Sequence, residues 1–349
     1  MKKKVLLVEF NNWHDECLHT ACLFFKSQGC ECSLVLNSRL ESRVGKDMCG
    51  DIPVTYFSFD GFKNLFGSFL QIGRMLRSEG YTHLYLNTAQ GSVAWKFFLI
   101  MAVPRRIKVV GVIHNVAKLN GSLGQRVITR RMDQYILLSD ILVDAYKRRC
   151  NKPVSVFYPI DYPLYGDTCI EKPAGELWIG IPGEMSYKRR DYDAIINESA
   201  KYGENVKFIF LCNCKKGDGK AIVSRIERFG LADNVILFDS FVDNATFYSY
   251  IRLCDYIMPL VHPSKDLYAK YLVEKISGTY NIAFAYRKVM LCPSEMAAYE
   301  DFSDTSVFYE EQDLCGFINS LSLIKDTTAF YKLEKWNRGT RYASAVFLE

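Results

Sequence analysis

The sequence predicts an α/β protein built from two doubly wound parallel sheets. Strand-like apolar runs alternate with helical patterns twice along the 349 residues, and such alternation is typical of a parallel sheet with helices on both faces. Hydrophobic residues make up 49% of the chain, which is enough for two domains with a core each. Residues 161–175 are rich in Pro and Gly and are the expected linker between the halves.

The first half, residues 1–160, is predicted to be an N-terminal Rossmann-like domain. Apolar runs predict strands at 4–10, 30–36, 54–59, 82–87, 107–114, 135–138 and 154–158. Helical patterns between them predict helices at 15–27, 66–78, 92–101 and 125–132.

The second half repeats this plan over residues 175–325 and is predicted to be a second Rossmann-like domain. We expect strands at 177–181, 206–212, 235–238, 256–261, within 282–292 and at 307–309. Helices are expected at 191–201, 221–229, 244–253, 266–277, 314–323 and 328–336. Residues 326–349 are expected to form a C-terminal helix that packs back on the first domain.

The stretch at 255–278 holds the most informative pattern of the second half. An apolar strand over 256–261 is broken at 262–264, and a helical pattern follows from Asp266. Glu274 lies eight residues further on, a little over two turns, so both carboxylates would share one helix face. Unpaired amides at a helix start bind phosphate, and carboxylates accept hydrogen bonds from sugar hydroxyls. The alternative is an Asp266 that only caps the helix and a Glu274 on the surface.

This arrangement resembles the E-x7-E signature of the retaining GT-B glycosyltransferases of family 4 (glycosyl transferases group 1), which follows a strand in their second domain. Asp266 stands at the first Glu and Glu274 at the second. Leu267, Tyr268 and Ala269 stand where the family has Gly-Phe-Gly. The resemblance implies the GT-B fold, with two Rossmann-like domains and an inter-domain cleft. It also implies that Asp266 is a catalytic residue at the donor sugar and that Leu267, Tyr268 and Glu274 bind the donor, Glu274 through the ribose.

A basic loop follows the first strand of the second half. Ligands of parallel α/β sheets bind at the carboxyl ends of the strands, and glycine with a basic cluster suits a diphosphate. Gly183 matches a family Gly, Lys188 or Arg189 matches a family Lys, and Glu184 stands where the family has Arg. Gly183, Lys188 and Arg189 are therefore the expected donor-binding residues of this loop. Either Arg190 takes over part of the phosphate contact or the site differs; a solvated basic turn is the alternative.

Polar residues also follow the strands of the first half. His114 ends an apolar strand, and in family 4 a His at that position lies near the donor sugar. The resemblance implies that His114 is a catalytic residue that hydrogen-bonds a sugar hydroxyl or the surroundings of the departing phosphate, rather than a base. Asn12 and His14 follow the first strand and Asn87 the fourth, and all three are expected to bind the acceptor. His262 is expected to contact the donor, unless it is only a turn residue.

Charge is unevenly divided along the chain. Residues 1–160 carry 22 Lys and Arg against 12 Asp and Glu, although the whole chain has a net charge of only +5. Apolar residues around 95–101 stand near basic clusters at 105–108, 126–131 and 147–149, a pattern that suits an interfacial helix on anionic lipid. The alternative is a core helix with a solvated basic rim. Nucleic acid is not an expected partner, since no recognised binding module appears.

The twelve cysteines and the absence of a long apolar run indicate the compartment. No run is long enough to span a bilayer and no secretory signal is apparent, so we expect a cytoplasmic protein, peripheral on the inner face of the cell membrane if the lipid prediction holds. The two C-x-C pairs, at 30–32 and 212–214, lack ligand partners at metal-binding spacing. Reduced core thiols are expected, and no metal or cofactor is expected beyond the nucleotide sugar as substrate.

The sequence therefore predicts a glycosyltransferase that uses a nucleoside-diphosphate sugar and a glycan or lipid-linked acceptor. The resemblance implies metal-independent transfer with retained anomeric configuration, in bacterial surface-polysaccharide biosynthesis. One alternative is a two-lobed sugar-nucleotide-binding protein without turnover. A GT-B sugar epimerase is a weaker alternative, because it needs an acid/base pair that the pattern does not clearly provide.

Overall fold

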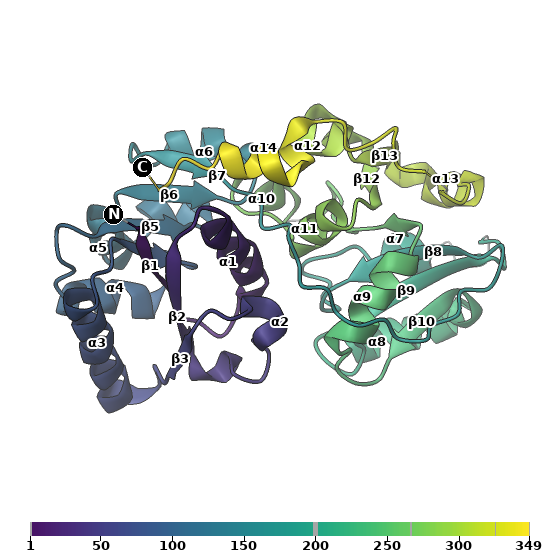
Figure 1. The fold of residues 1–349 in the computed structure, drawn as a ribbon. Helices are drawn as coiled ribbons and strands as arrows, with labels where there is room; N and C mark the ends of the chain where they lie inside the picture. Colours follow the sequence, from purple (N-terminus) through teal and green to yellow (C-terminus); the bar gives the residue numbers. More distant parts are fainter. Residues whose placement is uncertain (1, 198–201, 266, 325, 349) are drawn as a thin grey trace. The chain divides into compact units, whose positions relative to one another are not determined.

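A computed structural model describes residues 2–197, 202–265, 267–324 and 326–348. The chain forms two compact units, coloured along the sequence in Figure 1. Unit 1 contains residues 1–164, 273–276 and 337–349, and unit 2 contains residues 165–272 and 277–336. Residues 157–173, around the expected linker, have no regular secondary structure.

Unit 1 contains a parallel sheet with the strand order β3-β2-β1-β4-β5-β6-β7 among the described residues. The order reverses direction between β1 and β4, as in Rossmann-like folds. The strands are β1 (Lys4–Glu9), β2 (Glu31–Asn37), β3 (Val54–Phe57), β4 (His83–Leu86), β5 (Lys108–Val112), β6 (Gln134–Leu137) and β7 (Val154–Val156).

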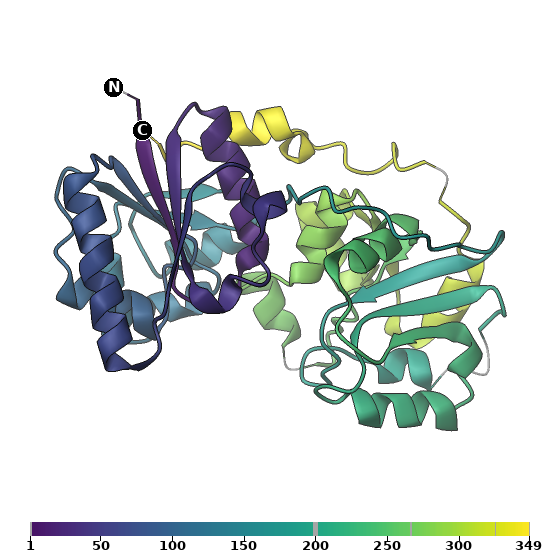
Figure 2. The ribbon, with the colours of Figure 1, turned by 60° about the horizontal axis from the view of Figure 1, so that its bottom comes forward.

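Helices cover both faces of this sheet (Figure 2). One face packs against α3 (Gly61–Ser78), α4 (Ser92–Ile100), α5 (Leu123–Arg131) and α6 (Val143–Lys147). The other face packs against α1 (Leu18–Ser27), α2 (Lys46–Cys49) and α14 (Arg338–Ala343). The C-terminal helix α14 is thus part of unit 1, together with the residues up to 348.

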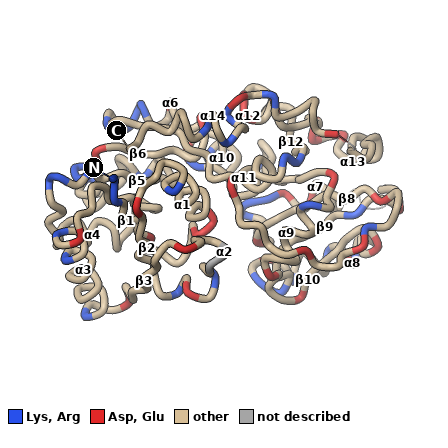
Figure 3. The backbone as a smooth tube through the Cα atoms, in the orientation of Figure 1, with Lys and Arg blue, Asp and Glu red and all other residues tan. Residues whose placement is uncertain are grey.

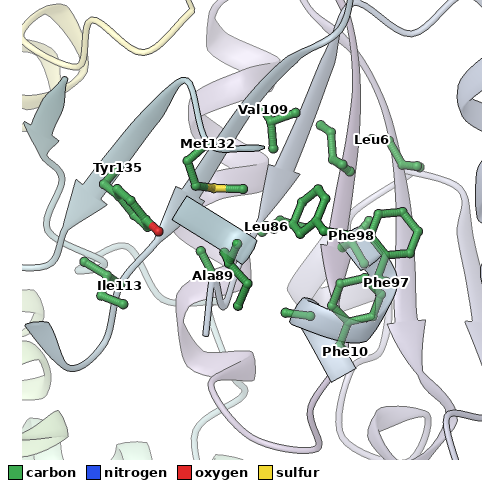
Figure 4. Packing of buried hydrophobic residues seen from close by; sticks show 14 of the residues in the cluster. Leu6, Phe10, Leu86, Ala89, Phe97, Phe98, Val109, Ile113, Met132 and Tyr135 are labelled. Carbon is green, nitrogen blue, oxygen red and sulfur yellow. The ribbon is translucent and has the colours of Figure 1, made fainter. Parts of the chain in front are cut away.

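The sequence of β1 explains why it is buried on both faces. Successive side chains of a strand point to opposite faces, so Leu6 and Val8 enter one core while Val5 and Leu7 enter the other. Figure 4 shows the first core, where the rings of Phe10 and Phe97 have centroids 5.3 Å apart. Apolar runs without polar alternation are expected for strands covered on both faces.

Unit 2 has the same topology, with the strand order β10-β9-β8-β11-β12-β13 over its described residues. Its strands are β8 (Leu177–Pro182), β9 (Val206–Asn213), β10 (Val235–Phe238), β11 (Tyr256–Ile257), β12 (Val289–Pro293) and β13 (Ser306–Tyr309). Its helices are α7 (Asp193–Ile196), α8 (Gly219–Arg228), α9 (Asn244–Leu253), α10 (Tyr268–Val273), α11 (Gly278–Ala285), α12 (Glu300–Ser303) and α13 (Leu314–Ser320). The direction again reverses between two strands, β8 and β11.

The single helix expected over 266–277 is wrong. Helix α10 ends at Val273, and a second helix, α11, begins at Gly278 with the side chain of Ser277 accepting a hydrogen bond from the amide of Thr279. Residues 273–276 belong to unit 1, where Ile276 packs against both hydrophobic cores. Glu274 is therefore not on a helix, and it cannot share a helix face with Asp266, which lies outside the described residues.

The strand expected within 282–292 is confirmed, since β12 begins at Val289, after helix α11. Another expectation near the C-terminus is corrected. No α-helix spans 328–336, where the described residues form turns and a short 3-10 helix, Glu334–Trp336. Asp304 explains this outcome, because its carboxylate accepts hydrogen bonds from the amides of Lys332 and Leu333 and from the Trp336 indole. Residues 326–336 lie in unit 2.

Candidate functional site

Polar side chains gather at the point where each sheet reverses its strand order. In parallel α/β sheets, this switch point at the carboxyl ends of the strands is where ligands bind. In unit 1 the point lies between β1 and β4, and in unit 2 it lies between β8 and β11. The loops that leave these four strands contain most of the residues that the sequence nominated, and each unit is considered by itself.

Glu9, the last residue of β1, anchors the polar cluster of unit 1. Its side chain is fully buried. One carboxylate oxygen accepts from the amide and side chain of Asn11, at 2.8 and 2.9 Å, and the other from Asn87 at 2.8 Å and Thr88 at 2.6 Å. Burial raises the pKa of Glu9, but all four partners are donors and favour the carboxylate. Glu9 therefore ties the loop after β1 to the loop after β4.

His14 and His114 stack within this cluster. Their ring centroids are 3.7 Å apart and the rings are inclined by 15°. Nε2 of His114 lies 2.8 Å from the carbonyl oxygen of Asn87, and a carbonyl only accepts, so Nε2 carries the proton and Nδ1 presents a lone pair. Burial, together with the charge of His14, lowers the pKa of His114 to about 3. His114 is thus a neutral hydrogen-bond acceptor at physiological pH.

Asn87 and Asn12 hold the loops around the two histidines. The side-chain nitrogen of Asn87 donates to Glu9 and, at 2.8 Å, to the backbone carbonyl of His14. The side-chain oxygen of Asn87 has no hydrogen-bond partner among the described residues. The carbonyl of Asn12 accepts a hydrogen bond from Arg43. The structure therefore brings His14, Asn87 and His114 together, with Asn12 in the same loop as His14.

The base of this cluster is rigid. Phe10, Leu86, Ala89 and Ile113 stand one or two residues from the polar groups, and Figure 4 shows them within the first core of unit 1. A Cβ atom on Gly111 of β5 would lie 2.5 Å from the Cβ atom of Ala89, so glycine is needed for this close approach. Core packing thus fixes the strand ends that carry the histidines.

In unit 2, the loop after β8 is built around Gly183 and Arg190. Gly183 has φ +105°, and a Cβ atom there would lie 2.7 Å from the guanidinium of Arg190. Arg190 is buried and donates to the carbonyl of Pro182 and to Thr279, the latter at 3.0 Å. Its second terminal nitrogen has no hydrogen-bond partner among the described residues. Lys188 and Arg189 are exposed at the same loop, and Arg189 lies 3.7 Å from Glu184.

His262 follows β11 and is fully buried. Its Nδ1 lies 3.2 Å from Asp191 and its Nε2 lies 2.6 Å from the hydroxyl of Tyr309. Lys265 approaches the other oxygen of Asp191 at 3.1 Å. Burial raises the pKa of Asp191, but His262 and Lys265 hold it below its usual range. Since both ring nitrogens bond within the protein, His262 joins three loops of unit 2.

The remaining nominated residues lie in the segment after His262. Asp266 lies outside the described residues. Leu267 is buried against Val261 and Tyr271, and the half-buried Tyr268 begins α10, with burial raising the pKa of its phenol. Glu274 is half-buried, and its carbonyl accepts a hydrogen bond from the amide of Val116 at 2.8 Å.

Sequence reasoning missed Glu9, Asp191 and Tyr309, and it considered Arg190 only as an alternative. Glu9 had a visible signal, because it is an acid at the end of an otherwise apolar run. Asp191 and Tyr309 had none, since their importance comes from contacts with His262. Within the described ranges, no group of three or more His, Cys, Asp and Glu side chains could hold a metal ion.

Two successive units with the same parallel topology define the class of this protein: it has the GT-B fold. It is similar over 99% of its length to Anabaena Alr3699/HepE in complex with UDP-glucose, with a TM-score of 0.64, 16% sequence identity and 96% of that chain covered. A glycosyltransferase from Rickettsia africae is similar with a TM-score of 0.60 and 12% identity, covering 98% of this chain and 93% of that one.

A solved structure of an epimerase is also similar to this chain. A UDP-N-acetylglucosamine 2-epimerase matches with a TM-score of 0.56 and 11% identity, over 91% of this chain and 86% of that chain. No known protein-family model matches the sequence, and no curated protein matches it. At these identities the comparisons establish the fold.

Proposed function

We propose that this protein is a glycosyltransferase that moves a sugar from a nucleoside-diphosphate sugar to a glycan or lipid-linked acceptor. The observation that carries the proposal is the switch point of unit 2, where a positive-φ glycine, a buried arginine and two exposed cations meet at the end of β8. A diphosphate can approach the backbone closely at a glycine, and it is stabilised by the positive charges of the buried arginine and the two exposed cations. The similar HepE structure holds UDP-glucose, which supports this choice of donor.

In this proposal unit 2 binds the donor. Lys188 and Arg189 contact the phosphates, Arg190 holds the loop around Gly183, and His262 positions Asp191 and the loop after β11. Leu267 and Tyr268 contribute to the donor pocket, and Asp266 hydrogen-bonds the donor sugar. Stabilisation of charge on the departing diphosphate supplies most of the catalysis, so no metal ion is required.

Unit 1 binds the acceptor in this proposal. Nδ1 of His114 accepts a hydrogen bond from a sugar hydroxyl, a role that its protonation pattern fits. Asn12, His14 and Asn87 bind acceptor hydroxyls. The resemblance to family 4 supports retention of the anomeric configuration and a setting in bacterial polysaccharide biosynthesis.

A peripheral contact of unit 1 with anionic membrane belongs to the same proposal. Phe97 and Phe98 are buried in the core, so they are not available to lipid. Leu99 and Leu123 are exposed, on α4 and α5, and Arg126 and Arg130 are exposed nearby on α5; Figure 3 marks the Lys and Arg residues by colour. No helix in the described part of the chain is both long and apolar enough to cross a bilayer. In this proposal the protein is cytoplasmic and contacts the surface of the inner face of the cell membrane.

Isothermal titration with UDP and a panel of UDP-, GDP- and dTDP-sugars tests the proposal. We expect at least one nucleotide sugar to bind and to be hydrolysed or transferred in an acceptor screen. Tight binding without turnover would favour the sugar-nucleotide-binding alternative. Conversion of UDP-N-acetylglucosamine to its C2 epimer would favour the epimerase, which the similar epimerase structure makes the second candidate. Absence of binding to every nucleotide sugar would refute the proposal.

A further inference from the structure

Two cysteines of unit 1 lie next to each other in the core between the sheet, α1 and α2. Cys22 belongs to α1 and Cys49 to α2, and both are buried as free thiols. The two thiols form a hydrogen bond. The surrounding contacts agree, because Nδ1 of His19, about one helical turn before Cys22, lies 2.7 Å from the carbonyl oxygen of Met48, which precedes Cys49. Helices α1 and α2 therefore meet at a pair of thiols.

This hydrogen bond makes the two thiols chemically different. It lowers the pKa of Cys49, and together with burial it raises the pKa of Cys22 well above its ordinary value. The thiol of Cys22 is thus the donor, and the sulfur of Cys49 accepts as a thiolate, the form of cysteine that reacts with oxidants. In the same core, burial raises the pKa of Cys32 to about 12. Cys49 is therefore suited to react, with Cys22 beside it to complete a disulfide.

Cys49 also lines a pocket at the surface of unit 1. The pocket has a volume of about 490 Å³, and Val44, Gly50 and Tyr56 line it as well. Burial and the charge of a Cys49 thiolate raise the pKa of Tyr56, so the sulfur lies near a phenol that borders the pocket. A water molecule occupies about 30 Å³ in the liquid, and hydrogen peroxide is only one oxygen atom larger. The pocket therefore provides a path for peroxide to this side of Cys49.

We propose that Cys22 and Cys49 are a peroxide-sensitive pair whose oxidation forms a disulfide between α1 and α2. The Cys49 thiolate attacks one oxygen of hydrogen peroxide, the O–O bond breaks, and the other oxygen leaves as hydroxide, which takes up the proton that Cys49 had lost. The sulfur of Cys22 then attacks the sulfenic acid on Cys49, and its proton leaves with the departing oxygen as water. The two thiols lose two electrons and two protons, and one peroxide becomes two waters.

The disulfide acts on the loop that follows β1. Helix α1 begins just after this loop, and residues 38–45 lead into α2. Arg43 of that segment donates to the carbonyl of Asn12 and lies 3.4 Å from Asp15, so it holds the loop. A covalent bond from α2 to α1 restricts local unfolding of the segment and keeps Arg43 in place. That this loop serves an acceptor rests on the proposed function, whereas the thiol chemistry does not.

Mass spectrometry of the full chain tests the proposal without a substrate. Reduced protein is treated with hydrogen peroxide, alkylated with iodoacetamide and digested. We expect most of Cys22 and Cys49 to be recovered in one disulfide-linked peptide, which dithiothreitol separates. Cys49→Ala should abolish this peptide, and Cys22→Ala should leave a sulfenic acid on Cys49 that dimedone captures. Cys32→Ala is the matched control, because Cys32 lies in the same core but outside the pair; its disulfide yield should stay within twofold of the wild type.

Limited proteolysis tests the effect on the segment that leads into α2. Trypsin cleaves after Arg39 and Arg43, which are exposed, and cleavage requires local unfolding of the chain around them. In the wild type, oxidation should slow this cleavage about threefold or more. Peroxide should change nothing in Cys49→Ala, and Cys32→Ala should respond as the wild type does.

A peroxide-treated wild type without the disulfide between Cys22 and Cys49 would overturn the proposal. So would a disulfide from Cys22 to Cys32 instead, or equal rates of cleavage before and after oxidation. Calorimetry with nucleotide sugars on the reduced protein tests the proposed function separately. A protein that forms the disulfide but binds no nucleotide sugar keeps this proposal and loses the proposed function, and the reverse result does the opposite.

Discussion

Asp161 and Arg341 form a buried ion pair, with Oδ2 and Nη2 2.5 Å apart although the residues are 180 positions apart in the sequence. Arg338 and Tyr342 also donate to Asp161, at 2.7 and 2.9 Å. Asp161 lies just before the chain leaves unit 1, and α14 begins just after the chain returns. One carboxylate thus holds both connecting segments at the same place on unit 1.

Removal of this carboxylate should destabilise unit 1. In Asp161→Asn the buried guanidinium of Arg341 loses its counter-ion, which typically costs about 3 kcal/mol or more. Burial raises the pKa of Asp161, but Arg341, Arg338 and Tyr342 lower it overall. The ion pair therefore stabilises the fold fully above the pKa of an unfolded Asp, and this stabilisation is lost as the pH falls through the lower folded pKa.

Urea denaturation of wild type and variant at several pH values checks this prediction. The difference in free energy of unfolding should be largest near neutral pH and should shrink under acid conditions. Asp239→Asn is the matched control, since Asp239 pairs with Lys215 at 3.1 Å on the surface, where solvent screens the pair and the loss of stability should be small. Equal losses in both variants would contradict a special role for Asp161.

The basic residues after β8 should differ in what they contribute: Lys188 and Arg189 to UDP binding, and Arg190 to stability as well. Lys188→Gln with Arg189→Gln should weaken binding of UDP about 10- to 100-fold, because each charge-assisted hydrogen bond to phosphate contributes about 1.5–3 kcal/mol. The melting temperature should not change, since both side chains are exposed. Arg190→Lys should lower both the affinity for UDP and the melting temperature, because Lys cannot reproduce the hydrogen bonds to Pro182 and Thr279.

Calorimetry with UDP and thermal denaturation measure the two effects separately. Arg228→Gln serves as the control, because it removes one exposed charge from the far end of α8. Unchanged UDP affinity in the Lys188 and Arg189 double variant would remove these residues from the donor site.

Tyr309→Phe should destabilise unit 2 by about 1–3 kcal/mol. Nε2 of His262 lies 2.6 Å from the hydroxyl of Tyr309, and burial raises the pKa of this phenol well above its usual value. Without this hydroxyl a fully buried ring nitrogen has no partner, and such a group costs about that much. Tyr250→Phe on α9 is the comparison variant. A smaller loss in Tyr309→Phe than in Tyr250→Phe, measured by denaturant unfolding, would show that the His262 network does not hold the loops.

The success of the sequence-based fold prediction has a local cause. Apolar runs such as that of β1 reflect burial on both faces of a parallel sheet, and a window of a few residues contains this information. The break between α10 and α11 cannot be predicted from such a window, because it depends on Ile276 packing against the cores of unit 1. The absent helix at 328–336 depends in the same way on distant hydrogen bonds to Asp304.

The candidate site shows the same limit. The position of His14, Asn87 and His114 after predicted strands is enough to predict them as site residues, because the topology brings the carboxyl ends of parallel strands together. The stack of His14 on His114 and the four donors around Glu9 cannot be predicted from the sequence, since they depend on the course of the loops after β1, β4 and β5. The chemistry of each group follows from those contacts and not from its position in the sequence.

Unit 1 should bind anionic vesicles through the exposed apolar residues of α4 and α5. Trp95 of α4 packs so closely on Gly124 of α5 that a Cβ atom there would lie 2.6 Å from the indole. Leu99 follows Trp95 by about one helical turn, and Leu123 directly precedes Gly124. The side chains of Leu99 and Leu123 are 64% and 77% exposed. Insertion of one leucine into lipid contributes about 1.5–3 kcal/mol when burial is complete, and each nearby Lys or Arg adds about 1 kcal/mol at low salt.

Co-sedimentation with vesicles of phosphatidylglycerol and phosphatidylcholine measures this binding. We expect Leu99→Glu with Leu123→Glu to reduce the bound fraction at least tenfold, and 0.5 M salt to reduce wild-type binding because it screens the basic residues. Leu164→Glu is the control, since Leu164 is 98% exposed but lies in the segment that leaves unit 1. Wild-type protein that stays in the supernatant at low salt would rule out the membrane contact, and it would favour a soluble glycan over a lipid-linked acceptor.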